Sequence, residues 1–152
     1  MYPGTLYRPG QPAFFVSLNN RYVLRCCDGI LVDGKSSGLS RFVYRSADKR
    51  DNYPGITPTA DTTWMTSYPK NPLAIGQIVN NGTSSFPPNV RYQELDFTTA
   101  DCPLELQRYL PNIWYSEDWH GEEGALDSVR TVVLVATRDL GPDEELFSTY
   151  IE

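Results

Sequence analysis

Histidine and cysteine are scarce in this chain, which contains one histidine, His120, and three cysteines, Cys26, Cys27 and Cys102. Their spacing does not match the ligand sets of structural zinc sites, so we expect no metal centre. An odd number of cysteines without a visible secretory signal indicates reduced thiols in an intracellular protein. A histidine-dependent hydrolase would have to use His120, whose Glu/Gly-rich surroundings are typical of a surface residue.

Long apolar runs are also missing, because the longest are residues 14–16 and 132–136. Both are too short to cross a bilayer, and residues 1–12 do not have the pattern of a signal peptide. We find no internal repeat and no domain linker. The length of 152 residues, with 3 Trp, 10 Tyr and 6 Phe, therefore predicts one folded domain over residues 1–152. Membrane proteins, collagen-like fibres and helical repeat arrays are excluded.

Basic residues are few in the second half of the chain. Residues 1–76 contain nine Lys or Arg and five Asp or Glu, whereas residues 77–152 contain four and fourteen. The formal net charge of −6 argues against a dedicated nucleic-acid-binding protein, and we expect no direct nucleic-acid binding. An acidic half can attract a basic peptide by long-range steering, but a solvated acidic surface explains the same charge.

Turn signals divide the first third of the chain into short segments. Asp28-Gly29 separates the runs 21–26 and 30–32, which predicts a β-hairpin, and residues 14–18 have the composition of a further strand. Residues 46–63 are polar and rich in turn-forming residues, which predicts a surface loop. These segments favour a mainly β fold.

The remaining segments predict one short helix and one long strand. Residues 102–110 favour a helix, with Pro103 in its first turn. Residues 131–136 show no alternation of polar and apolar side chains, which predicts a strand buried on both faces. Residues 71–80 fit either a strand or a short helix, and residues 116–128 form a second polar excursion. We therefore expect a mainly β domain with one or two short helices.

Two motifs near the end of the chain carry the functional signal. The segment VVLVATRDLGPDEELFSTY (132–150) joins an apolar strand to Ala-x-Arg-Asp-Leu and then to Glu-Glu-Leu-x-x-x-Tyr. Upstream, IVNNGTSSFPPNV (78–90) places Asn-Asn and Pro-Asn around a short loop. Both motifs, in this order, resemble the signatures of SET-domain methyltransferases. Further similar stretches extend the resemblance over almost the whole chain.

This resemblance implies a SET fold with a knot-like β-clip core. In that fold the C-terminal segment threads beneath an earlier loop, which would bring Asn80 and Tyr150 together. The family binds S-adenosylmethionine on one side and a substrate lysine on the other. The resemblance thus implies a protein-lysine N-methyltransferase that acts on a lysine-bearing protein or peptide, in the nucleus or the cytoplasm. The oligomeric state is not predicted.

The resemblance also implies roles for individual residues. Tyr150 matches the tyrosine that orients the methyl group and the attacking amine, and its alternative is a core tyrosine. Asn80 matches the asparagine that hydrogen-bonds the cofactor. Asn81 stands where the family usually has a histidine whose backbone contacts the adenine. The alternative for Asn80 is a residue of an Asn-Asn-Gly turn. At Asn81 a backbone role survives the substitution, whereas the packing of the histidine side chain does not.

Other residues near these motifs have less specific roles. Arg138-Asp139 and Glu144-Glu145 are expected to shape the turn rather than take part in chemistry. Three tyrosines can line a lysine channel or belong to the core, and they are Tyr44, Tyr92 and Tyr115.

The chain departs from the family pattern at its beginning. SET domains start with a Gly-x-Gly strand, and no such motif precedes Met1-Tyr2-Pro3-Gly4. We therefore expect the domain to lack that strand, and cysteine-rich flanking segments are missing too. The alternative to the enzyme is then a catalytically inactive SET-like protein-interaction module.

Overall fold

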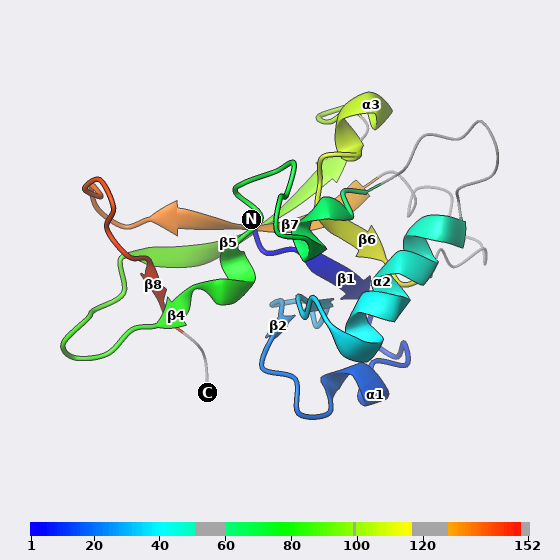
Figure 1. The fold of residues 1–152 in the computed structure, drawn as a ribbon, viewed down its shortest axis with the longest axis horizontal. Helices are drawn as coiled ribbons and strands as arrows, with labels where there is room; N and C mark the ends of the chain where they lie inside the picture. The colour runs from blue at the N-terminus through cyan, green and yellow to red at the C-terminus, as the bar shows by residue number, and fades with distance from the viewer. Residues whose placement is uncertain (51–59, 99, 117–127, 150–152) are drawn as a thin grey trace.

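The computed structural model describes residues 1–50, 60–98, 100–116 and 128–149 (Figure 1). Over these residues the strands are β1 (Gly4–Tyr7), β2 (Val23–Arg25), β3 (Leu31–Asp33), β4 (Asn80–Asn81), β5 (Val90–Thr98), β6 (Asn112–Trp114), β7 (Ser128–Ala136) and β8 (Phe147–Ser148). The helices are α1 (Phe14–Ser17), α2 (Gly38–Arg50) and α3 (Leu104–Gln107), with 3₁₀ turns η1 (Thr63–Met65) and η2 (Gly76–Ile78). The mainly β class predicted from the sequence is confirmed.

Four strands form the central sheet in the order β2-β3-β1-β6, in which β6 runs parallel to β1 and the other pairs are antiparallel. The register aligns Leu24, Val32, Leu6 and Trp114 in one row across the sheet. Aligned residues share a face, and this row packs with Val132 of the antiparallel ribbon β5–β7. Leu6, Val32 and Val132 are completely buried there.

Helix α2 covers the opposite face of the sheet. Ile113 of β6 lies in a second apolar cluster with Tyr44 and Ala47 of α2 and with Trp64 of η1. The Tyr44 and Trp64 rings meet edge to face, with centroids 5.3 Å apart. The Tyr44 hydroxyl donates to the Asp61 carbonyl at 2.8 Å. The body of the molecule is thus a sheet with a β-ribbon on one face and a helix on the other.

Several local predictions are confirmed. The β2–β3 hairpin turns at Asp28-Gly29, where Gly29 has a φ of +88° and Asp28 accepts from the Ile30 amide. Helix α3 forms within 102–110, and β7 includes 131–136. The prediction that 131–136 is buried on both faces holds only for its first half, because Val135 is 40% exposed.

The prediction of a strand at 14–18 is wrong, because residues Phe14–Ser17 form helix α1. Phe14 and Phe15 are 67% and 70% exposed, and only Val16 of the helix is buried. The segment lies outside the sheets, so its backbone pairs locally, with the Ser17 amide donating to the Ala13 carbonyl. Composition alone favoured a strand for which the fold provides no partner.

The prediction of a loop at 46–63 is wrong for its first residues, because α2 continues to Arg50. Residues 51–59 lie outside the described residues. The buried stripe of α2 consists of Ser40, Tyr44, Ala47 and Asp48, at helical spacing but with mostly small or polar side chains. The large apolar residues Leu39 and Phe42 face solvent, so the hydrophobic pattern does not reveal this helix.

Among the described residues, none of the helices has the length and apolar character needed to cross a membrane.

Candidate functional site

The two sequence motifs meet at the parallel pair β4–β8. Asn80 aligns with Phe147, and Asn81 aligns with Ser148. The next backbone bond extends this ladder, because the Gly82 amide donates to the Ser148 carbonyl at 2.7 Å. Figure 1 shows this corner at the far end of the β5–β7 ribbon from helix α2. The fold therefore brings together segments that are more than sixty residues apart in the chain.

Tyr150, the predicted catalytic residue, lies outside the described residues. It follows β8 by two positions. The described part of the chain thus places the segment that leads to Tyr150 against the two asparagines predicted to bind the cofactor. The threading that the family resemblance implies involves residues 150–152, which are not described.

The Asn89 side chain makes several of the hydrogen bonds that hold β8 in this position. Asn89 is 2% exposed, and its Oδ1 accepts from the Phe147 amide at 2.8 Å. Its Nδ2 donates to the Glu145 carbonyl at 2.9 Å and to a Glu144 carboxylate oxygen at 3.1 Å. Its backbone amide donates to the Phe147 carbonyl at 2.9 Å. Both sides of the Asn89 amide group are therefore satisfied by residues 144–147, which lead into β8 and include its first residue.

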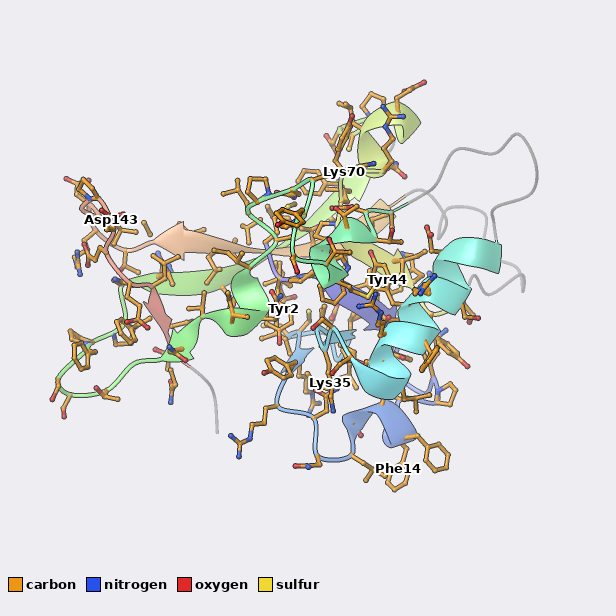
Figure 2. The ribbon with its side chains drawn as sticks, in the orientation of Figure 1. Tyr2, Phe14, Lys35, Tyr44, Lys70 and Asp143 are labelled. Atoms are coloured by element: carbon orange, nitrogen blue, oxygen red, sulfur yellow. The ribbon has the colours of Figure 1, made fainter. Side chains whose placement is uncertain are left out.

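The turn between β7 and β8 is closed by Arg138 and Glu144. The Arg138 guanidinium donates to both carboxylate oxygens of Glu144, which also accepts from the Gly141 amide at 2.9 Å. The Arg138 guanidinium, with smaller contributions from Gly141 and Asn89, lowers the pKa of Glu144 to about 2. Asp143 adopts a positive φ of 58° at the tip of this turn, which is labelled in Figure 2. Arg138 and Glu144 thus shape the turn, as the sequence predicts.

The loop from β4 to β5 packs on β8 from the other side. Phe86 stacks on Phe147 with ring centroids 5.4 Å apart. A Cβ atom on Gly82 would lie only 2.7 Å from the Pro88 ring, so a larger residue at 82 would push this loop away. The loop and β8 are therefore in direct contact.

Asn80 and Asn81, the predicted cofactor-binding residues, are both exposed at the edge of this corner. The Asn80 Nδ2 donates to a Glu145 carboxylate oxygen at 2.9 Å, and the Oδ1 of the same amide is a hydrogen-bond acceptor. An amide oxygen and a carboxylate accept hydrogen bonds from amino and ammonium groups. This edge can therefore contact a polar ligand that carries such groups.

The three tyrosines predicted to line a channel or the core do not share one site. Tyr44 is buried under α2, and Tyr115 stacks on Tyr7 with centroids 5.1 Å apart. Tyr92 packs edge to face on Tyr2, and its hydroxyl donates to the Gly76 carbonyl at 3.3 Å. Because Gly76 begins η2, directly before β4, Tyr92 approaches the candidate site most closely of the three.

One group of side chains in the described residues has the geometry of a metal site. Ligand atoms of Cys26, Asp28 and Glu94 lie within 4.8 Å of one another. However, the Arg130 guanidinium donates to Asp28 at 2.7 Å, to Glu94 at 3.0 Å and to Asp96 at 2.7 Å. Burial raises the pKa of the Cys26 thiol to about 11, so it stays protonated near neutral pH. This group is an arginine–carboxylate cluster rather than a set of metal ligands.

The sequence pattern alone does not give Asn89 a role, although Pro88-Asn89 is part of the upstream motif. Its position in that motif is the sequence feature that could have pointed to a role. Its partners in the 144–147 segment lie more than fifty residues away, so no local pattern indicates them.

Comparison with known proteins identifies two close relatives. SET domain-containing protein 9 from Pongo abelii is 49% identical over 150 residues, which are 99% of this chain and 52% of that protein. SET domain-containing protein 9 from Homo sapiens is also 49% identical over 150 residues, with 48% of its length covered. The chain thus spans about half the length of both relatives.

No protein-family model and no solved structure matches the sequence. The match to both relatives nevertheless extends over 99% of the chain. This identity supports the assignment of the chain to the SET-domain family.

Proposed function

We propose that this chain forms part of an S-adenosylmethionine-dependent protein-lysine N-methyltransferase of the SET type. The observation that carries the proposal is the parallel pairing of β4 with β8, which puts Asn80 and Asn81 beside the segment leading to Tyr150. Two motifs distant in sequence are expected to meet if they build one site. The family membership of the chain supports the same function.

The side chains at this edge fit one side of the proposed cofactor. S-adenosylmethionine carries an ammonium group and an amino-substituted adenine, and both are hydrogen-bond donors. The Asn80 Oδ1 and the exposed Glu145 carboxylate offer acceptors for such donors. When bound, the cofactor would supply a methyl group on a positively charged sulfur.

The residues of the chain would then position the reaction. The Tyr150 hydroxyl would orient the attacking lysine amine, because direct displacement depends on in-line alignment. The lysine has to lose its proton first, and an apolar, water-poor channel lowers the pKa of an ammonium group. Asn89 would be a positioning residue, since it fixes the segment that precedes Tyr150 without facing solvent itself.

A second candidate function is a SET-like module that binds a protein partner without catalysis. Two observations favour it. Asn81 replaces the family histidine, and Tyr44 and Tyr115 are engaged in packing at separate places rather than lining a common channel. In this case the partner would contact the exposed aromatic and acidic surface of the chain.

Calorimetric titration with S-adenosylmethionine separates the two functions. It should be done on the 152-residue chain and on a version extended upstream, because the relatives are about twice as long. We expect binding to at least one of them. Folded protein that binds the cofactor in neither form would refute the methyltransferase and leave the interaction module.

The substitution Tyr150→Phe tests the catalytic assignment on the form that binds. With isotope-labelled S-adenosylmethionine and a panel of lysine-containing peptides, we expect methyl transfer to fall by about a hundredfold while the cofactor still binds. Tyr68→Phe is the matched control, because Tyr68 is 90% exposed and should be replaceable without effect. Undiminished transfer in Tyr150→Phe would exclude the proposed role.

A further inference from the structure

The sequence Asn81-Gly82 at the candidate site has a chemical property of its own. The backbone nitrogen that follows an asparagine can attack the side-chain amide carbon, and glycine is the residue that hinders this attack least because it has no Cβ. Asn81-Gly82 is the only Asn-Gly pair in the chain.

The fold controls both partners of this reaction. The Asn81 side chain is exposed, so water and base reach it. The Gly82 nitrogen, which would be the nucleophile, donates its hydrogen to the Ser148 carbonyl at 2.7 Å. Asn81 itself lies in the extended pair β4–β8, in which its register partner is Ser148. The Gly82 nitrogen is therefore engaged in a hydrogen bond as long as β8 is paired with β4.

We propose that Asn81 is a site of spontaneous deamidation and that the docking of β8 on β4 sets its rate. When β8 separates, the Gly82 nitrogen loses its proton and bonds to the Asn81 side-chain carbon. The bond from that carbon to Nδ2 breaks, and the amide nitrogen leaves with the proton as ammonia. Water then opens the resulting succinimide ring at either carbonyl, which gives aspartate or isoaspartate at position 81.

The products oppose the return of β8. Isoaspartate adds a methylene to the backbone after residue 81, which moves the Gly82 amide out of register with the Ser148 carbonyl that it bonds in the native pair. Either product also adds a negative charge one residue from Asn80, whose side chain bonds to Glu145 in the turn before β8. Deamidation thus converts a transient opening of the corner into a lasting one.

The first test compares one protein in two states. The chain is incubated at mildly alkaline pH, folded or in concentrated urea, and deamidation of the Asn81 peptide is followed by mass spectrometry. We expect the folded protein to react at least roughly tenfold more slowly, as protection by a local closed state requires. Equal rates in the two states would overturn the proposal. The variant Asn81→Gln is the control for assignment, because the deamidation signal of this peptide should disappear when Asn81 is replaced.

A second test separates local opening from global unfolding. Phe147→Ala removes the ring that stacks on Phe86, and Phe15→Ala is the matched control because its ring is 70% exposed on α1. We expect deamidation at Asn81 to accelerate several-fold in Phe147→Ala and to stay at the wild-type rate in Phe15→Ala. If Phe147→Ala does not fold, Asn89→Ala takes its place. Acceleration in neither folded variant would contradict control by β8. Neither test involves S-adenosylmethionine, so a failure of the proposed enzyme function does not affect them.

Discussion

The body of the molecule and its β4–β8 corner are stabilised in different ways. In the body, Leu6, Val32 and Val132 are completely buried between the four-stranded sheet and the β5–β7 ribbon. In the corner, the two strands have two residues each, and both residues of β4 are exposed. The corner is held mainly by hydrogen bonds to Asn89 and by the Arg138–Glu144 pair. Apolar burial dominates one region, and directional polar contacts dominate the other.

This difference indicates that the candidate site can open while the body stays folded. Local opening is easiest where few apolar contacts are lost, and the corner offers little apolar surface besides the Phe86–Phe147 stack. A site built this way depends on a few polar side chains, among them the buried Asn89. Substitutions in the two regions should therefore have distinguishable effects.

The largest effect is expected in the body, from Leu6→Ala. Leu6 is completely buried in the row that crosses the sheet, and large-to-small substitutions of this kind cost about 2–5 kcal/mol. Urea unfolding measures this loss, and Leu18→Ala is the control because Leu18 is 55% exposed. Equal stability of the two variants would mean that the apolar row does not dominate the body.

Sequence patterns predicted the body better than they predicted the corner. The Asp28-Gly29 turn and strand β7 depend on local signals, namely residues that permit a positive φ and a run of β-branched side chains. Helix α2 was missed because its buried stripe includes Ser40 and Asp48 while Phe42 faces solvent. The large apolar side chains of α2 therefore lie on its exposed side, so the apolar pattern does not predict which side of the helix is buried.

The corner was predicted only through the family resemblance. Nothing within residues 78–90 indicates that Asn89 bonds to residues 144–147, because such long-range polar pairing leaves no periodic signal. The resemblance predicts that Asn80 and Tyr150 lie together; the structure pairs Asn80 with Phe147, three residues before Tyr150. The role of Tyr150 stays a prediction.

An intermediate effect, confined to the corner, is expected from Asn89→Ala. The substitution leaves the Phe147 amide and the Glu145 carbonyl, whose bonds to Asn89 are partly buried, without their partner, at a cost of about 1–3 kcal/mol. Hydrogen exchange should show faster exchange at the Gly82 and Phe147 amides and unchanged protection at Leu6.

The control for Asn89→Ala is an asparagine that anchors the other region. Asn20 donates to the Val16 carbonyl and to Asp33 at 2.8 Å each, so it links α1 to β3. Asn20→Ala should leave the Gly82 amide protected. Loss of protection at Leu6 in Asn89→Ala would show that the corner and the body open together, contrary to the comparison.

The smallest effect is a pH dependence that differs in sign between the two regions. In the corner, Arg138 holds the pKa of Glu144 near 2, below its ordinary value of 4.5. The stability that Glu144 contributes is present above pH 4.5 and is lost as the pH falls toward 2. In the body, burial raises the pKa of Asp33 above its ordinary 3.8, so its contribution is present in acid and is lost as the pH rises through the higher value.

From the titration of these two carboxylates, we expect amide protection in the corner to fall between pH 5 and pH 2, whereas protection around Asp33 should not fall. Hydrogen exchange at Gly82 and at Lys35, whose amide donates to Asp33, reads the two regions separately. In Glu144→Gln the neutral side chain no longer titrates, so the corner should open more readily at neutral pH and change less in acid. Because Gln keeps an acceptor oxygen for Gly141, any remaining difference reports the loss of the ion pair with Arg138 together with the acceptor for Asn89. If hydrogen exchange at Gly82 depends on pH in the same way in Glu144→Gln and in the wild type, a group other than Glu144 causes the acid sensitivity of the corner.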